Sequence, residues 1–361
     1  MPRTTQCWMG ILVLFSSACA APLTQQQGVS HSQLVDEQRK QQAFTLKGNL
    51  EMQQRLDSVA FPLLRAATPL CGDRTGMRAG IHVATVESFD TQWQQAARDI
   101  GLSDTSTVTS VAAGSAAERA GVRVGDRLVA YNGVALPVGH DATRAFAKSV
   151  SAMQQSGSTD LTVDLRRNDE PLDIHIPMDR MCAFDAEEVP SSELNAFADG
   201  KTVYVTSAMM RFAASDDELA TVVAHEIGHN AMRHMDAKKR NAGIGALFGA
   251  VLDVASASQG VNTGGQYSNQ FAAMGAQKYS QSFENEADYV GLYILALAGR
   301  PLDQVPMFWR KMAQENPVSI KFASSHPTTA ERFVRIQAAV EEIEGKEARG
   351  EPLRPELKSK N

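Results

Sequence analysis

The sequence predicts an α+β fold in which a β-rich half is followed by a mainly helical half. Between residues 77 and 180, short alternating apolar segments are separated by turns that contain glycine, which is typical of strands. Between residues 183 and 345, apolar residues recur at helical spacing behind capping residues. The chain has 361 residues, 43% of them hydrophobic, and is long enough for two domains with separate cores.

The composition excludes several classes of protein. Charged residues make up 21% of the chain, and 41 acidic residues against 35 basic ones give a formal net charge of -6. This balance argues against nucleic acid as the main partner. Only one early segment approaches the length of a membrane span, so a membrane protein of several spans is excluded. The composition is also far from that of disordered chains.

The first 20 residues resemble a secretory signal peptide. Arg3 supplies a positive charge, residues 8–15 form an apolar core that is too short to span a bilayer, and small residues follow. Cleavage after Ala20 fits these small residues and would discard Cys19. The same residues also resemble a lipoprotein processing site, which would leave Cys19 lipidated. We therefore expect export to the periplasm, either free or anchored to the outer membrane through Cys19.

Export changes the expected state of the cysteines. Cys7 lies inside the signal and Cys19 is removed or lipidated, which leaves Cys71 and Cys182 in an oxidising compartment. A disulfide between these two would clasp the base of residues 71–182 and stabilise it by up to about 4–5 kcal/mol on the entropic model. The alternative is two buried free thiols. Neither has the CxxC spacing of a redox or zinc-ribbon site.

Residues 21–70 begin rich in glutamine and then become helical. Apolar residues recur at roughly helical spacing between Leu46 and Leu64. Pro62 is expected to break or bend this helix. We expect the helix to pack against one of the later domains. The alternative is a free coiled-coil arm, for which the heptads are few.

Residues 71–182 are expected to form a small β-rich domain. Ser115 can cap a short helix, and Asn132 with Gly133 favours a tight hairpin turn. The expected elements are, in order, a strand over 80–86, the short helix ending at Gly121, a strand over 128–131, a helix over 141–153, and two alternating strands around 161–165 and 172–176.

This order of elements, and the stretch from Ser115 to Gly133 above all, resemble a bacterial PDZ domain of the kind attached to exported proteases. The resemblance implies a peptide ligand that adds a strand to an exposed edge of the sheet. His82 and His175 have no partner at ligand spacing, so they are expected to lie at the surface.

An HExxH motif, HEIGH at 225–229, lies on a helix that begins with the capping sequence at 215–218. Residues four apart lie one turn apart on the same face, so both imidazoles can reach one metal ion. Glu226 points beside the ion, where it can take a proton from a water. His234 lies on the opposite side of this helix from His225 and is expected to be exposed.

A second acidic motif, ENEAD at 284–288, begins another apolar helix. Glu284 and Asp288 share one face, so that one can bind the metal while the other orients a ligand imidazole. Glu286 points about 160° away from that pair and is the weaker ligand candidate. Two histidines and one carboxylate leave a fourth position for water, as in catalytic zinc sites.

Six features follow one another along residues 195–332. They are, in order, Asn195–Ala198, the strand at 202–205, HEIGH, ENEAD, Ser325-His326-Pro327 and Arg332. Together they resemble the gluzincin metallopeptidases of the HtpX and CAAX-prenyl-protease type, and most of all their exported, BepA-like branch. The resemblance implies a zincin-like fold for residues 183–345. The sequence lacks the many spanning helices of the prenyl-protease members, which argues against a prenylated membrane substrate.

The resemblance also implies the composition of the site. One Zn²⁺ per chain would be bound by His225, His229 and Glu284, with Glu226 as the general base and acid. Asp288 would support a ligand imidazole from outside the ligand set.

His326 is implied to lie close to the metal. It would either stabilise the oxyanion of the transition state or act as an inhibitory fourth ligand, and Arg332 would order its loop.

The sequence also supports structural expectations for three more segments. Thr202 to Val205 is a candidate edge strand on which an extended substrate could lie. Residues 241–258 are rich in glycine and alanine, and are expected to form either an amphipathic flap over the cleft or an ordinary packed helix. The residues from Glu341 onward are mostly charged, and 346–361 are expected to form a solvated tail.

Two functions are compatible with these features. The first is an exported zinc metalloendopeptidase whose PDZ domain selects or positions unfolded or damaged envelope proteins. The second is a PDZ-bearing chaperone or adaptor whose metal site is inactive or latched by His326. The intact HExxH and ENEAD motifs favour the first. Both imply polypeptide partners and no nucleic acid, with Cys19 as a candidate membrane tether.

Overall fold

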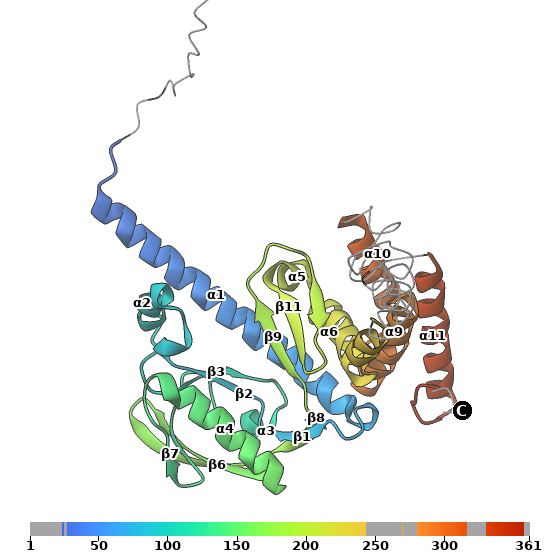
Figure 1. The fold of residues 1–361 in the computed structure, drawn as a ribbon, viewed down its shortest axis with the longest axis horizontal. Helices are drawn as coiled ribbons and strands as arrows, with labels where there is room; N and C mark the ends of the chain where they lie inside the picture. Colours follow the sequence, from blue (N-terminus) through green and yellow to red (C-terminus); the bar gives the residue numbers. More distant parts are fainter. Residues whose placement is uncertain (1–23, 25–26, 243–268, 270–279, 316–329, 357–361) are drawn as a thin grey trace, which may run out of the picture.

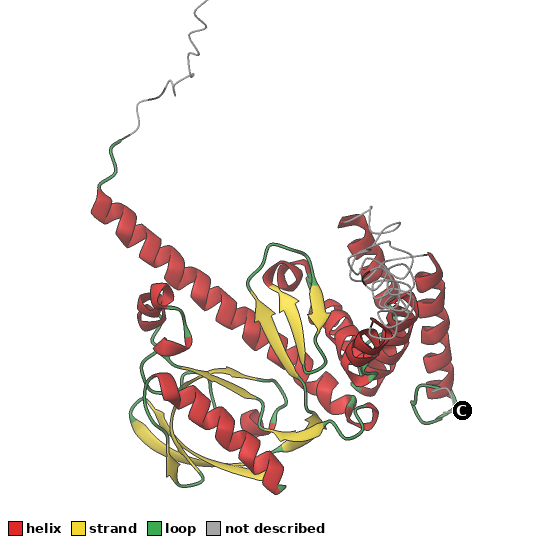
Figure 2. Ribbon diagram, in the orientation of Figure 1, coloured by secondary structure: helices red, strands yellow, loops and turns green. Residues whose placement is uncertain are grey.

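One long helix, α1 (His31–Ala66), lies between two groups of elements (Figure 1). A β-rich group lies on one side of α1, and a mainly helical group with a small sheet lies on the other (Figure 2). The predicted α+β class is confirmed. The computed structural model describes residues 24, 27–242, 269, 280–315 and 330–356.

The two halves of α1 have different surroundings. The helix begins with a capping box between Ser30 and Gln33, and its first turns are exposed. From Leu46 onward it is buried on one face, so the prediction of a packing helix is confirmed. The expected break at Pro62 is wrong, because the helix continues through this residue to Ala66.

Two neighbouring glutamines on α1 connect it to both groups. The Gln54 amide donates to the Val111 carbonyl (2.7 Å) and accepts from the Val111 N–H (2.8 Å) in the β-rich group. The Gln53 amide donates to the Ala186 carbonyl (2.9 Å) and accepts from the Glu188 N–H (2.7 Å) in the other group. Each amide satisfies backbone groups that would otherwise need a strand partner.

The β-rich group, here called the PDZ-like region (residues 75–182), contains one larger sheet in the order β2-β3-β4-β6-β7, with β5 paired to β4. Asn132 and Gly133 have positive φ and form the hairpin turn after β4, as predicted. The elements are β2 (Ile81–Ala84), η2 (Val86–Ser88), α2 (Thr91–Asp99), β3 (Thr107–Val111), α3 (Ala116–Arg119), β4 (Arg127–Tyr131), β5 (Val134–Ala135), α4 (His140–Ser156), β6 (Asp160–Arg167) and β7 (Glu170–Pro177).

The base of the PDZ-like region is closed by a second ladder and a disulfide. Strands β1 (Thr75–Arg78) and β8 (Asp179–Cys182) pair antiparallel. Cys71 follows the short helix η1 (Thr68–Leu70) and forms a buried disulfide with Cys182. His82 and His175 are partly exposed, at 43% and 62% of their side chains, as expected for surface residues.

The second group begins with a three-stranded sheet, β9 (Asp185–Val189), β10 (Ala196–Ala198) and β11 (Thr202–Thr206). Its order is β10-β11-β9. The prediction that residues 202–205 form an edge strand is therefore wrong, since β11 has a partner on each side. The edges of this sheet are β9 and β10, and β9 is the strand that Gln53 of α1 contacts.

The helices of this second group share one core with the buried half of α1. The prediction that residues 346–361 form a solvated tail is wrong for its first residues, because helix α11 (Ala330–Ala348) continues past residue 345. Lys346 is buried, and its ammonium group lies 2.8 Å from the Tyr293 hydroxyl and 2.9 Å from the Glu356 carboxylate. The helices are α5 (Ser207–Phe212), α6 (Asp216–Ala231), α9 (Ser280–Leu297), α10 (Val305–Glu315) and α11 (Ala330–Ala348).

Several predictions concern residues outside the described part of the chain. These are the signal-like residues with Cys19, nearly all of the segment 241–258, and His326. Among the described residues, no helix is both long and apolar enough to cross a membrane.

Candidate metal centre

Helix α6 carries the HExxH residues, and hydrogen bonds and an ion pair in its first turn determine where it begins. The Ser215 hydroxyl accepts a hydrogen bond from the Glu218 N–H (3.1 Å), as an N-cap does. The Glu218 carboxylate accepts one from the Ala214 N–H (2.7 Å) and pairs with Lys311 of α10 (2.9 Å). All three acidic residues of this turn lie at the positive end of the helix dipole, where they stabilise the helix.

The end of α6 is fixed from the other side. The Arg74 guanidinium donates to the carbonyls of Asn230 (2.6 Å) and Ala231 (2.9 Å) at the C-terminal end of the helix. The Asn230 side chain accepts from the Gly200 N–H (2.8 Å) in the turn between β10 and β11. Both ends of the motif helix are therefore anchored to neighbouring elements.

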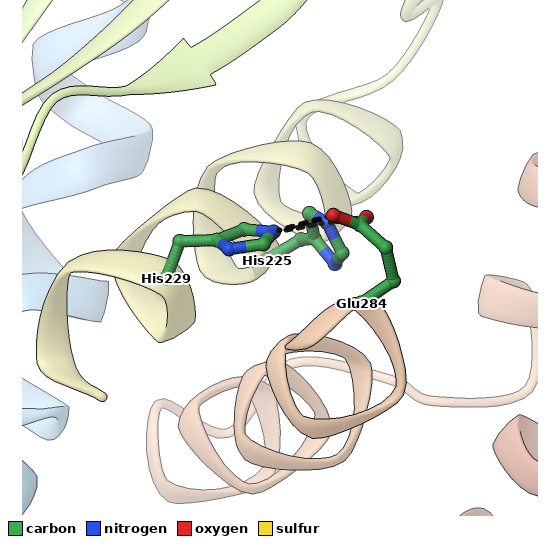
Figure 3. Close-up of side chains that lie close together, drawn as sticks. All are labelled: His225, His229 and Glu284. Carbon is green, nitrogen blue, oxygen red and sulfur yellow. Dashed lines mark hydrogen bonds and ion pairs between the residues drawn. The ribbon is translucent and has the colours of Figure 1, made fainter. Parts of the chain in front are cut away.

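Three side chains meet between α6 and α9 (Figure 3). His225 and His229 lie one turn apart on α6, and their Nε2 atoms are 3.1 Å apart. Glu284 lies near the start of α9. Its Oε2 is 3.3 Å from Nε2 of His225, and its Oε1 is 3.4 Å from Nε2 of His229. None of the three side chains is more than 4% exposed.

These atoms have the geometry of a zinc site. Zinc bonds of about 2.0–2.1 Å in a tetrahedron place neighbouring ligand atoms about 3.3–3.4 Å apart. The two Nε2 atoms are 3.1 Å apart, and each has one oxygen of Glu284 at a similar distance, Oε2 at 3.3 Å from His225 and Oε1 at 3.4 Å from His229. Two imidazoles and one carboxylate leave a fourth position, as in catalytic sites. Within the described part of the chain, these three residues form a group able to bind a metal ion.

Glycines allow α6 and α9 to approach closely enough to form the site. A Cβ on Gly228 would lie 2.9 Å from the carbonyl oxygen of Ala287, and one on Gly291 would lie 3.2 Å from the backbone of Ala224. Neither position has room for a side chain, because the nearest atoms belong to the backbone of the other helix and cannot rotate away. The glycine inside the HExxH motif thus sets the distance between Glu284 and the two histidines.

Comparison with protein families identifies this domain. Residues 173–340 match the model of peptidase family M48, and residues 107–167 match a PDZ domain. The chain carries a peptidase domain of family M48. The M48 match contains all three residues of the metal-binding triad.

Known proteins resemble parts of the chain. The mitochondrial metalloendopeptidase OMA1 of Saccharomyces cerevisiae is 32% identical over 152 residues, 40% of this chain and 43% of that protein. The beta-barrel assembly-enhancing protease of Yersinia pestis is 33% identical over 136 residues, 36% of this chain and 28% of that protein. The chain thus spans less than half the length of these relatives. A crystal structure of the HtrA3 PDZ domain bound to a phage-derived ligand aligns with 30% of this chain and 88% of that chain, at 21% identity and a TM-score of 0.23.

In the M48 domain, His225 is supported by Asp288 one turn after Glu284. The Asp288 carboxylate lies 2.8 Å from Nδ1 of His225, which leaves Nε2 facing the triad. Arg332 of α11 donates two hydrogen bonds to the same carboxylate, at 2.5 and 2.7 Å, and its guanidinium stacks on Trp309 at 4.1 Å. Asp288 and Arg332 therefore position His225 through two buried, charge-assisted contacts.

The two imidazoles of the M48 domain differ in their ionisation. Burial lowers the pKa of His225, but the charge and hydrogen bond of Asp288 and the hydrogen bond of Glu284 outweigh it and raise the pKa to about 9. Burial lowers the pKa of His229 to about 4, and the hydrogen bond with Glu284 offsets only part of that effect. A metal bound at this triad would therefore have to displace a proton from His225, whereas it would meet His229 in its neutral form.

The prediction that His234 is exposed is wrong. Helix α6 ends at Ala231, and Arg233 adopts a positive φ of 57°, so the helical spacing does not continue to His234. The His234 side chain is 1% exposed, with Nδ1 2.9 Å from Nδ1 of His229 and Nε2 2.8 Å from the Glu286 carboxylate. Glu286 contacts this histidine and is not one of the triad residues.

Glu226 is buried at 2% exposure beside the triad. It directly follows His225 on α6 and is not one of the triad residues. A carboxylate next to a metal ligand in an HExxH motif can serve as the proton acceptor for an attacking water.

Proposed function

We propose that the protein is an exported zinc metalloendopeptidase that cleaves polypeptide substrates with the help of its PDZ domain. The observation that carries the proposal is the buried triad of His225, His229 and Glu284 with Glu226 next to His225 on the same helix. The proposal also draws on the M48 match and on the names of the two metalloendopeptidase and protease relatives.

The chain's own residues support hydrolysis. The triad would hold a zinc ion, which would supply a Lewis acid able to polarise a peptide carbonyl and lower the pKa of water. Glu226 accepts the proton of the attacking water and passes it to the leaving amine. Asp288 fixes the ring of His225, so that Nε2 stays directed at the metal position.

The sheet edge at β10 is suited to an extended substrate. In the described part of the chain, β10 pairs only with β11, and it packs on α6. Phe197 on β10 is 40% exposed and stacks on Tyr204 of β11 at 4.9 Å, which gives this edge an apolar surface. Pairing with β10 would use backbone hydrogen bonds and so require little of the substrate except that it be unfolded.

A cavity supports the contribution of the PDZ domain. It has a volume of about 610 Å³ and lies between β2, α4, the buried half of α1, and β9 of the M48 domain. β2 is an edge strand of its sheet, so an added peptide strand would lie in this cavity. The apolar side chains around it are Phe61, Leu64, Phe146, Val150, Met181 and Phe184. A peptide bound here would contact the peptidase domain as well as the PDZ domain.

Export and a role in envelope quality control are part of the proposal. The signal-like first 20 residues and the disulfide between Cys71 and Cys182 support an oxidising compartment. The relative in Yersinia pestis is named for beta-barrel assembly, which suggests unfolded or damaged envelope proteins as substrates. Fractionation of cells that express the wild type and Cys19→Ser tests export and the lipid anchor. Loss of membrane association in the variant supports the lipid anchor, and cytoplasmic wild-type protein contradicts export.

The test of the activity is Glu226→Gln. The variant keeps the zinc ligands but loses the proton acceptor, so it should retain about one zinc per chain and lose cleavage of unfolded casein by at least about 100-fold. Glu341→Gln, an exposed change on α11, is the matched control and should cleave at the wild-type rate. Chelation of zinc should abolish cleavage by the wild type.

Two outcomes would contradict the peptidase. Full activity in Glu226→Gln would exclude the role given to this carboxylate. Zinc-loaded wild type without turnover of any unfolded substrate would favour the chaperone or adaptor.

A further inference from the structure

His229 contacts a second imidazole from beyond the end of its helix. His234 lies 2.9 Å from it through the two Nδ1 atoms, and 2.8 Å from Glu286 of α9 through Nε2. The three side chains thus form a continuous line from the triad toward the surface, since Glu286 is 47% exposed and His234 only 1%. We propose that His234 and Glu286 are positioning residues that hold His229 in the tautomer and orientation required by the metal. This inference rests on the proposed zinc site.

The positions of the protons follow from the geometry. Nε2 of His229 faces His225 and Glu284, so a metal bound there requires the ring proton on Nδ1. That N–H then donates to Nδ1 of His234, which must accept. The proton of His234 is consequently on Nε2, where it donates to the Glu286 carboxylate. In this row of hydrogen bonds from His229 to Glu286, each N–H donor therefore meets one acceptor.

Packing fixes the ring of His234. Phe283 stacks on it with centroids 4.6 Å apart and an angle of 21° between the planes. His229 meets it edge-on, at 4.9 Å and 79°. The positive φ of Arg233 turns the chain so that the ring faces back to the helix. The orientation of His234 is therefore set by several elements at once.

The two metal ligands on α6 have supports of different kinds. His225 is held by a buried carboxylate whose charge Arg332 balances. His229 is held by an imidazole, whose carboxylate partner lies partly in solvent. An imidazole next to His229 can accept its ring proton, whereas a second buried carboxylate would add negative charge close to the triad.

The test compares variants that separate packing from hydrogen bonding. His234→Phe keeps an aromatic ring against Phe283 but removes the acceptor that His234 provides for the Nδ1–H of His229. We expect the zinc affinity of the full-length protein, measured by chelator competition, to fall about 10- to 100-fold. The cobalt-substituted protein should show a changed visible absorption spectrum. His234→Asn restores an acceptor near the position of Nδ1 and should recover part of the affinity.

Glu286→Gln keeps an acceptor for His234 and should lose less affinity than Glu286→Ala. His175→Phe, on the exposed face of the PDZ domain, is the matched control and should bind zinc as the wild type does.

The outcomes distinguish this inference from the proposed function. If the wild type binds no zinc, the proposed function fails. If the wild type binds zinc and His234→Phe binds it with equal affinity and the same cobalt spectrum, only the positioning role is overturned. A lower melting temperature of metal-free His234→Phe with unchanged zinc affinity would show that His234 serves packing alone.

Discussion

Asp288 is buried between two positive partners, and its ionisation depends on both. Burial raises the pKa of this carboxyl, but the charges of Arg332 and His225 and their hydrogen bonds outweigh burial and lower it. The carboxylate is therefore charged in the folded protein. A buried charge of this kind depends on its partner, because removing one member of such a pair leaves the other uncompensated.

Replacement of Arg332 by methionine should destabilise the protein. The change keeps an apolar stem but removes the guanidinium from Asp288, and the free energy of unfolding should fall by about 3–5 kcal/mol. Arg335→Met removes an exposed ion pair with Glu331 on the same helix and should cost at most about 1 kcal/mol. Denaturant unfolding measures both. Equal losses in the two variants would contradict the role of the buried pair.

Part of the site was predictable from the sequence. Helical spacing placed His225 and His229 on one face and left Glu284 and Asp288 as alternatives for the acidic ligand, and the family resemblance indicated Glu284. His234 was misplaced because the same spacing was extended past the end of α6, where Arg233 leaves the helical region. The position of this residue depends on a turn that helical periodicity does not describe.

At the scale of elements, the approach of α6 to α9 determines whether the ligands meet. Gly228→Ala places a methyl group 2.9 Å from the carbonyl oxygen of Ala287, which must move. We expect the variant to bind zinc at least about 10-fold more weakly, because Glu284 moves with α9. Gly48→Ala, in α1, meets nothing within 4 Å and should stabilise the protein by about 0.5–1 kcal/mol. Unchanged zinc affinity in Gly228→Ala would contradict this account.

Glu188 makes strand β9 sensitive to pH. Oε1 of this residue is buried and accepts no hydrogen bond from the described residues. Burial raises the pKa of the carboxyl from 4.5 to about 7, and the charge of Arg211 offsets only part of the effect. The folded protein thus binds this proton more tightly than the unfolded chain does, so stability falls as the pH rises from about 4.5 to about 7.

Glu188→Gln should remove this loss of stability. The difference in the free energy of unfolding between variant and wild type should be larger, in favour of the variant, at pH 8 than at pH 5. Glu187→Gln, exposed on the same strand, is the control. Denaturant unfolding at the two pH values is the measurement, and a difference that does not depend on pH would contradict the prediction.

The sequence pattern of a strand does not reveal which strands pair with it. The strand expected at 202–205 is present as β11, but its sequence carries no information about which strands lie beside it. β11 is central because β9 and β10 pair on its two sides, and the β9 pairing joins residues that are 17 positions apart in parallel register. An apolar strand with partners on both sides and an apolar edge strand over a core have similar sequences.

At the scale of the whole molecule, the disulfide ties the end of α1 to the start of the M48 sheet. Cys71 and Cys182 are separated by 111 residues, and Cys182 lies three positions before β9. Such a link restricts the unfolded chain, and the effect grows with loop length.

The double variant Cys71→Ala, Cys182→Ala should lose up to about 4–5 kcal/mol of the free energy of unfolding on the entropic model. Denaturant unfolding of the variant under oxidising conditions is the measurement. Wild type unfolded in the presence of a reductant should give a similar loss. If neither treatment lowers stability, the bridge does not contribute to it.

The overall division of the chain was also predictable in part. The two regions and their order followed from their different periodicities, whereas the extent of α11 was underestimated because its last turns are rich in charge. Lys346 is buried despite its charge, since Tyr293, Glu342 and Glu356 surround its ammonium group. Composition alone does not reveal partners that lie far away in the sequence.

The central position of α1 has a consequence for biosynthesis. On the ribosome α1 is made before every element that covers it, because the elements it contacts, among them α2, β3, β9, α6 and α9, all follow it in the sequence. Leu56, Val59 and Leu63, which are fully buried in the finished protein, must therefore remain without a core while well over one hundred further residues are added. Transiently exposed apolar surface of this kind promotes aggregation. A newly made chain would need to be shielded along α1 until the M48 sheet and α6 have folded onto it.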